Sequence, residues 1–173
     1  MTDDDLLRSL TIREFNAKDQ SAARRIVLAG LGEHFSKLEP SLNPDLDDID
    51  AAYLERGHRF FVAAVKDEII GTGGILFENK SSARIVRMSV SPEFRGHGIG
   101  KAIVSHLVDF AQQSGIKRIL IETNLDWYSA INLYKQCGFR EQYSDDTSLH
   151  LLLEIEPHKG RPARHESGLP VND

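Results

Sequence analysis

The sequence predicts a single mixed α/β (α+β) domain whose central, mostly antiparallel sheet has about seven strands flanked by about four helices. The chain has 173 residues, of which 40% are hydrophobic, so it can build one substantial core but hardly two. Three β-rich runs separated by short turns lie between residues 59 and 91, as in an antiparallel meander. A strand, a helix and another strand follow, and such a crossover makes adjacent strands parallel.

The N-terminal part is expected to supply one strand and two helices. The acidic leader, residues 1–9, is expected to be flexible. Residues 10–15 form the predicted strand, and 16–35 a helix with apolar residues near one face. The proline- and aspartate-rich residues 36–50 are typical of an exposed connection, ahead of a short helix at 48–57.

The rest of the chain alternates strands and helices before a closing hairpin. An amphipathic helix is predicted at 99–115, because apolar residues recur there at helical spacing and Gly115 is the residue type expected just after a helix C-terminus. A second helix, 126–138, ends at Gly138. The tail, 157–173, has three prolines and little apolar content, so we expect it to be disordered. The strands predicted in this part are 59–65, 68–78, 83–91, 116–123, 139–143 and 148–156.

Composition argues against several classes of protein. A formal charge of −5 disfavours a general nucleic-acid binder, which needs lysine and arginine to neutralise phosphates. Acidic residues stand where a secretory signal would be basic, and the longest apolar run, 60–65, is too short to cross a membrane. The lone Cys137 excludes an intrachain disulfide and fits a cytoplasmic location. The seven histidines form no metal-binding pattern, so no metal site is expected.

The stretch "SPEFRGHGIGK", residues 91–101, places three glycines at alternate positions just before the helix predicted at 99–115. Glycine in a helix costs about 1 kcal/mol relative to alanine, so these residues weaken the element that they introduce. A glycine-rich turn at a helix N-terminus is, however, a good anion site. Its first N–H groups lack partners, and no Cβ blocks the approach of phosphate oxygens.

Two familiar phosphate motifs do not match this turn. A P-loop needs glycine at position 95 and Ser or Thr at 102, where the chain has Arg95 and Ala102. A dinucleotide fingerprint needs its third glycine at 101, which is Lys101. The pattern that remains is Arg95-x-x-Gly98-x-Gly100.

This pattern resembles the acyl-coenzyme A signature of the GNAT superfamily of N-acyltransferases: Arg or Gln, two residues, Gly, one residue, then Gly or Ala. The resemblance continues through "ILIETNLDWYSAINLYKQCGF", residues 119–139, which is similar to the family's next strand and its "AIxLYxxxGF" helix. It covers residues 85–139 well, whereas the N-terminal third matches only in the order of its elements. It implies one GNAT-like N-acetyltransferase domain over residues 10–156.

The resemblance implies acetyl-coenzyme A as the acyl donor, without a metal. Its pyrophosphate would lie on the backbone amides of 96–101, and its pantetheine arm would bond the strand edge at 88–90. Many relatives have a pantetheine-binding asparagine where this chain has Trp127, so Asn124 is expected to supply a similar amide, and Trp127 packs on cofactor or acceptor or is a core aromatic. The predicted cofactor-binding residues are Met88, Ser89, Val90, Arg95, Gly96, His97, Gly98, Ile99, Gly100, Lys101, Asn124 and Tyr134.

Acetyl transfer to an amine needs a base, an oxyanion site and a proton for the departing thiolate. Tyr134 matches the family tyrosine that protonates the thiolate, and the alternative is a core aromatic beside Leu133. Glu122 interrupts an apolar strand and is the candidate base or a structural carboxylate, with Glu78 or a water chain as alternatives. A strand N–H near Val90 would meet the oxyanion.

The acceptor is expected to be an amine of a small molecule or of a peptide or protein. The acidic residues of the 36–50 segment suit a cationic acceptor or form only a solvated loop. They are Glu39, Asp45, Asp47, Asp48 and Asp50. The main alternative to an enzyme is a non-catalytic acyl-coenzyme A binding or sensor module, and a weaker one is a nucleotide-binding regulator. The sequence leaves open whether the protein forms a homodimer.

Overall fold

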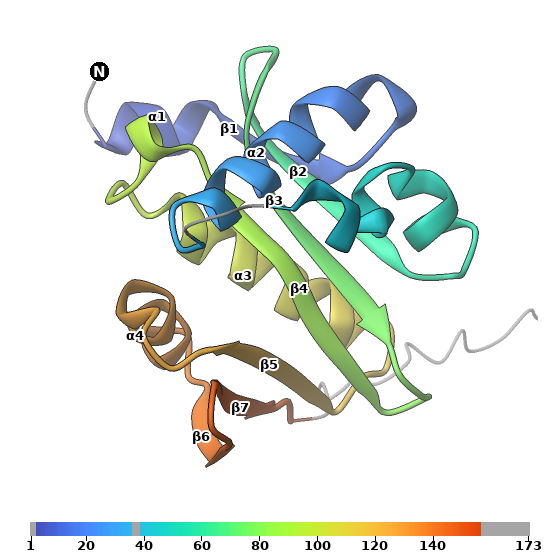
Figure 1. The fold of residues 1–173 in the computed structure, drawn as a ribbon, viewed down its shortest axis with the longest axis vertical. Helices are drawn as coiled ribbons and strands as arrows, with labels where there is room; N and C mark the ends of the chain where they lie inside the picture. The colour runs from blue at the N-terminus through green and yellow to red at the C-terminus, as the bar shows by residue number, and fades with distance from the viewer. Residues whose placement is uncertain (1–2, 36–38, 157–173) are drawn as a thin grey trace, which may run out of the picture.

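Seven strands form one central sheet in the order β1-β2-β3-β4-β5-β7-β6 (Figure 1). The computed structural model describes residues 3–35 and 39–156. The strands are β1 (Leu10–Glu14), β2 (Arg59–Val65), β3 (Glu68–Phe77), β4 (Ser82–Val90), β5 (Arg118–Asn124), β6 (Arg140–Ser144) and β7 (Ser148–Glu154). The helices are α1 (Asp3–Ser9), α2 (Gln20–Gly32), α3 (Ile99–Gln113) and α4 (Tyr128–Gln136). Only the neighbours β4 and β5 pair in parallel, so the predicted mixed, mostly antiparallel fold is confirmed.

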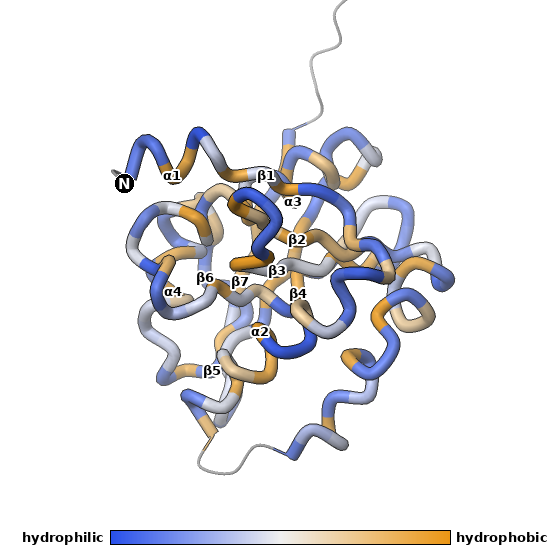
Figure 2. Tube along the Cα trace, turned by 90° about the horizontal axis from the view of Figure 1, so that it is seen from above, coloured by the Kyte–Doolittle hydropathy of each residue, from blue (hydrophilic) through white to orange (hydrophobic). Residues whose placement is uncertain are grey.

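Strand β2 is buried on both faces of the sheet, which explains why its sequence is continuously apolar rather than alternating. Phe61 and Ala63 join the cluster that packs against α3 and α4. Phe60 and Val62 join a second cluster beneath α2 and the short turns that follow it. Figure 2 shows the hydrophobic positions concentrated along these central strands. The sheet therefore separates two apolar layers.

Glycines in β3 let α3 approach the sheet closely. A Cβ on Gly71 would lie 2.8 Å from Ile103, and one on Gly73 would lie 2.9 Å from both Ile103 and Leu107. Such distances are too short for real carbon contacts, so a larger residue would push the helix away. A Cβ on Gly100 would lie 3.1 Å from Leu133, which is a tight contact, and 4.0 Å from Val90, which is an ordinary one. This close packing fixes the N-terminus of α3 beside the end of β4.

The sheet opens into a fork between β4 and β5 (Figure 1). These strands pair only at Ser82↔Arg118, Ala83↔Ile119 and Arg84↔Leu120, and then diverge. On its other side β4 carries a bulge, where residues 87 and 88 oppose a single residue of β3. Arg87 has a φ of 54° there, and the Thr72 hydroxyl donates to its carbonyl at 2.8 Å. The bulge bends the strand that forms one wall of the fork.

Two N-terminal segments differ from expectation. The predicted flexible leader is helical from Asp3 to Ser9, because three aspartates favour a helix N-terminus and the buried Leu6 anchors one turn to the core. The described part of the predicted connection, residues 39–50, is likewise anchored by the fully buried Leu46 and Ile49. The helix predicted at 48–57 is a short π-helical turn, η4 (Asp50–Leu54). The disordered tail predicted at 157–173 lies outside the described residues.

Leu6→Ala should destabilise the protein by about 2 kcal/mol or more, because it removes a buried side chain and leaves a cavity. Leu7→Ala is the matched control on the same helix, since Leu7 is 39% exposed and Leu6 only 4%. Thermal unfolding of both variants tests this expectation. Equal melting temperatures would mean that α1 does not pack on the core in solution.

Candidate functional site

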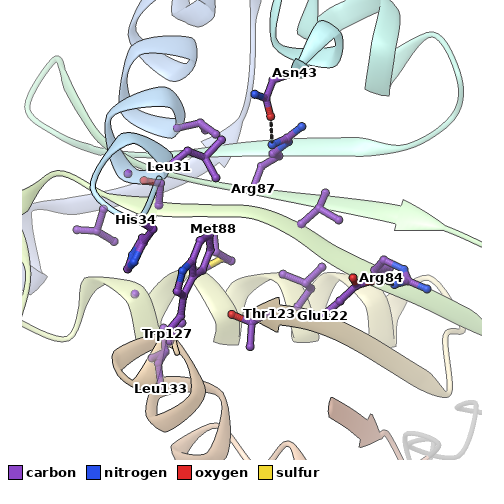
Figure 3. A pocket seen from close by; sticks show the side chains of 18 of the residues that line it. Leu31, His34, Asn43, Arg84, Arg87, Met88, Glu122, Thr123, Trp127 and Leu133 are labelled. Carbon is purple, nitrogen blue, oxygen red and sulfur yellow. Dashed lines mark hydrogen bonds and ion pairs between the residues drawn. The ribbon is translucent and has the colours of Figure 1, made fainter. Parts of the chain in front are cut away.

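A cleft of about 1580 Å³ passes through the fork between β4 and β5 (Figure 3). Its walls come from the end of α2, the 42–45 segment, the diverging strands, the glycine turn and the start of α4. Beyond Arg84 the β4 edge that faces β5 has no strand partner, so its backbone groups can bond a ligand in extended conformation. The cleft thus joins a helix N-terminus to an unpaired strand edge.

The glycine turn presents a series of free backbone donors. Gly96 and Gly98 have φ values of 81° and 82°, which favour glycine, and Gly98 is the N-cap of α3. The first helical hydrogen bond is donated by Ala102 N to Gly98 O, at 3.0 Å. Among the residues that the structure describes, the N–H groups of 96–101 find no acceptor. This arrangement, at the positive end of a 15-residue helix, suits a phosphate group.

Two basic side chains of the turn are engaged by protein carboxylates. The Arg95 guanidinium pairs with both oxygens of Glu33, at 2.6 and 2.9 Å, and its Nε donates to Val90 O at 2.8 Å. Hydrogen bonds from Arg95 hold the pKa of Glu33 below its usual range. His97 Nδ1 lies 2.6 Å from Asp3 Oδ1. Arg95 therefore ties the turn to α2, and cofactor contacts by these two side chains stay predictions.

Most residues predicted to bind the cofactor come together in the cleft. Those that line it are Met88, Ser89, Val90, Arg95, Gly96, Gly98, Ile99, Gly100, Lys101, Asn124 and Tyr134. His97 is not among the lining residues. The Ser89 hydroxyl donates to Ile26 O at 3.1 Å, so its side chain holds α2 to β4, and a cofactor contact at Ser89 would be left to its backbone.

The Tyr134 hydroxyl faces the cleft from α4. The residue is 7% exposed, and no described residue accepts or donates a hydrogen bond at its oxygen. Since no buried polar side-chain atom in the described part of the chain lacks a partner, this oxygen must reach the cleft surface. Burial raises the pKa of the phenol, and neighbouring Cys137 adds to the effect. Tyr134 is thus a neutral phenol whose hydroxyl bonds no described residue.

The two candidate bases, Glu78 and Glu122, share Arg84, and Figure 3 shows Arg84 beside Glu122. Arg84 Nε donates to Glu78 Oε1 at 2.9 Å, and its Nη1 donates to Glu122 Oε2 at 3.2 Å. Glu122 lines the cleft, whereas Glu78, which follows the end of β3, does not. The geometry therefore favours Glu122 over Glu78, although both carboxylates are bound to a cation.

Trp127 stands at the cleft wall rather than inside the core. Its ring stacks on His34 with centroids 4.2 Å apart and planes 28° apart, and Phe35 meets it edge-on at 5.9 Å. His34 and Phe35 follow α2, so the aromatic contacts connect that helix to the start of α4 across the fork. Of the alternatives for Trp127, packing on a bound ligand fits this position better than a core role.

Sequence reasoning missed a polar network where the 42–45 segment meets β4 in the cleft. Arg87 binds both oxygens of Asp45, at 2.6 and 2.9 Å, and donates to Asn43 at 3.0 Å. The Tyr53 hydroxyl also donates to Asp45, at 2.8 Å. Burial, followed by this hydrogen bond, raises the pKa of Tyr53. Two arginines in an otherwise mainly apolar strand, Arg84 and Arg87, were the available signal.

The acidic 36–50 segment uses much of its charge internally. Asp45 pairs with Arg87, and Asp47 pairs with Arg24 at 3.2 Å. Asp48 accepts from the Ala51 N–H at 3.0 Å, as a helix cap does. The segment therefore attracts a cationic acceptor less than its composition suggests.

Residues 3–35 and 39–156 contain neither a metal-binding cluster nor a helix that could span a membrane. Within these ranges no three histidine, cysteine or acidic side chains are grouped so that they could hold a metal ion. The helices there are all too short or too polar to cross a membrane. Cys137 is not a cleft residue, and burial raises the pKa of its thiol. A packing role explains it.

Comparisons with known proteins give the same relationship by sequence and by structure. Residues 26–139 match the family described as "Acetyltransferase (GNAT) family". Human N-acetyltransferase 8B is 34% identical over 107 residues, which are 58% of this chain and 47% of that protein. The Escherichia coli (strain K12) protein named "Uncharacterized N-acetyltransferase YjgM" is 30% identical over 155 residues, covering 86% of this chain and 93% of that one. The chain thus spans about half the length of its human relative and nearly all of its bacterial one.

The solved structures agree on the fold. PaiA N-acetyltransferase from Thermoplasma acidophilum, in complex with coenzyme A, superposes with a TM-score of 0.74. The match covers 85% of this chain and 99% of that one, at 14% sequence identity. At this identity the likeness concerns the fold alone.

Proposed function

Because this chain belongs to the GNAT family of acetyltransferases, we propose that it transfers the acetyl group of acetyl-coenzyme A directly to an amine. One observation carries the proposal: the cleft brings together the unpartnered amides of 96–101, the Tyr134 hydroxyl and the Glu122 carboxylate. An anion site alone would suit many ligands. An anion site that shares a cleft with a proton donor and a carboxylate suits acyl transfer.

The donor would bind along the fork. Its pyrophosphate would accept hydrogen bonds from the amides of 96–101, where the helix dipole also favours negative charge. Its pantetheine arm has amide groups, which would bond the free edge of β4 at 88–90 and the side chain of Asn124. Lys101 is exposed at the same end of the cleft and adds a positive charge there.

In the transfer step the amine nitrogen would attack the thioester carbonyl carbon. A backbone N–H near Val90 would stabilise the oxyanion, and the C–S bond would break as the tetrahedral intermediate collapses. The departing thiolate would take its proton from Tyr134. Before the attack the acceptor ammonium would give one proton to Glu122, directly or through water, so that the attacking nitrogen is neutral. After the attack the nitrogen would lose a second proton, which restores the proton on Tyr134, and Glu122 would release its proton to solvent. One proton is thus released in each transfer.

The decisive experiment follows free thiol release from acetyl-coenzyme A across a panel of amines. Amine-dependent release would support the enzyme and exclude the pure binding module. Calorimetric binding of acetyl-coenzyme A without release for any amine would favour the non-catalytic module. Equal affinity for acetyl-coenzyme A and for a simple nucleoside diphosphate would instead favour the nucleotide-binding regulator.

Gly98→Asp should weaken acetyl-coenzyme A binding about tenfold or more, because a carboxylate would stand where the pyrophosphate approaches the amides. Gly98→Asn is the matched control. It adds nearly the same bulk at the same φ of 82° but no charge, and a Cβ there would have ordinary contacts with Leu7 at 3.7 Å. Calorimetry should show a clear gap between the two variants. Equal affinities of the two variants for acetyl-coenzyme A would mean that the pyrophosphate does not bind at this turn.

A further inference from the structure

Arg84 occupies the vertex of the fork. It belongs to the last register pair between β4 and β5, Arg84↔Leu120, and its side chain lines the cleft with 30% exposure. A guanidinium has five N–H donors, of which two are used here, by Glu78 and Glu122. Its Nη2 donates to no residue in the described part of the chain. Arg84 therefore keeps donors for a further acceptor, directly beside the candidate base.

The other arginines of the cleft are less suited to a ligand carboxylate. Arg87 is occupied by Asp45 and Asn43, and Arg95 is bound through both terminal nitrogens to Glu33. Arg56 also lines the cleft, but it forms no ion pair with a described carboxylate, so it lacks the cation–anion pair that Arg84 makes with Glu122. Among the cleft arginines that bind a described carboxylate, only Arg84 leaves a whole terminal nitrogen, Nη2, without an acceptor in the described part of the chain.

The spacing of these two groups fits one class of acceptor. Arg84 Nη1 and Glu122 Oε2 are 3.2 Å apart. In an α-amino acid the ammonium nitrogen and the carboxyl carbon are attached to one carbon, about 2.5 Å apart by standard bond lengths and angle. Such a molecule can contact both groups at once, carboxylate to Arg84 and ammonium to Glu122. A simple alkylamine satisfies only the second contact.

We propose that Arg84 binds the carboxylate of a free α-amino acid and thereby determines acceptor specificity. This inference rests on the proposed acetyl transfer. The incoming carboxylate takes the Nη edge of the guanidinium, while Nε keeps its bond to Glu78. Glu122 then exchanges its contact with Arg84 for one with the substrate ammonium, whose proton it accepts. The correct acceptor thus releases the base that it needs.

The test measures thiol release from acetyl-coenzyme A at neutral pH with each L-amino acid and with its α-carboxamide. The amide lacks the carboxylate, and its amine has a pKa of about 8, so more of it is neutral and reactive. Without a carboxylate site the amide should therefore react faster. We expect the best amino acid to exceed its own amide about ten- to hundredfold in kcat/KM, as for loss of a charged hydrogen bond.

Substitutions test whether Arg84 causes the preference for the amino acid over its amide. Arg84→Gln should abolish the preference for acid over amide, Arg84→Lys should keep part of it, and the control Arg56→Gln should keep it fully. Melting temperature and acetyl-coenzyme A affinity should stay near wild type in all three. A preference that survives Arg84→Gln, or that Arg56→Gln removes, would overturn the proposal.

The same panel separates this inference from the proposed function. Turnover only with amides, polyamines or peptide amines would overturn the amino-acid acceptor while upholding the acetyltransferase. If acetyl-coenzyme A binds but no amine causes thiol release, both the proposed transfer reaction and this inference are wrong.

Discussion

Replacing Tyr134 by phenylalanine should lower the saturated transfer rate about 10²- to 10⁴-fold, the usual effect of losing a positioned proton donor. That loss corresponds to about 3 to 5 kcal/mol of activation free energy. The folded state should change little, because the ring keeps its volume and its packing near Phe139. No described group bonds the hydroxyl, so its removal leaves no buried partner unsatisfied. Acetyl-coenzyme A affinity should likewise stay close to wild type.

The pH profile gives this role a second signature. Burial raises the pKa of Tyr134 above its ordinary value of about 10, so the phenol stays protonated throughout the neutral and mildly alkaline range. The donor is lost only as pH rises through the raised pKa. Wild-type turnover should therefore show no alkaline decline from this group below about pH 10.

Tyr128→Phe is the matched control, since Tyr128 begins the same helix but is 71% exposed. It should leave the rate unchanged. Saturated rates and melting temperatures of both variants, measured on the same preparations, separate the two roles of Tyr134. Near-normal turnover in Tyr134→Phe, or lower stability with an unchanged rate per folded molecule, would assign the tyrosine to the core.

The part of the site that is local in sequence could be predicted, and the part that depends on distant segments could not. The glycine turn and α3 lie within one stretch of chain, so spacing alone indicated donors at a helix N-terminus. The pairing of Arg84 with Glu122 joins residues 38 positions apart across a fork. No sequence feature of β4 or β5 indicates that the two strands diverge after three register pairs.

The N-terminal differences have a similar origin. Seven residues of α1 are too few to show a helical period, and three aspartates hide the one leucine that packs on the core. In the 36–50 segment the prolines and aspartates suggested an exposed connection, whereas the described part contains the short turns η2 (Pro40–Leu42) and η3 (Pro44–Leu46) and buries Leu46. That Asp45 meets Arg87 of a strand 42 residues later depends on the β4 bulge, which no local pattern encodes.

Glu122→Gln should lower the saturated rate about 10²- to 10⁴-fold at neutral pH if this carboxylate takes the proton of the attacking amine. Glutamine keeps the size of the side chain and can still accept a hydrogen bond from Arg84. The deficit should shrink as pH rises toward the pKa of the acceptor amine. Solvent then supplies the neutral nucleophile, and the base is no longer needed.

Glu78→Gln provides the comparison, because both substitutions remove one carboxylate partner of the same guanidinium. Arg84 keeps an ion pair in either variant, and such partly exposed pairs contribute at most about 1 kcal/mol, so stability should change little and similarly in both. Only Glu122 lines the cleft, hence only its variant should lose rate. A larger loss of rate in Glu78→Gln would identify Glu78, just after the end of β3, as the base. Small and equal losses would mean that neither carboxylate takes the proton, which would then have to leave through water.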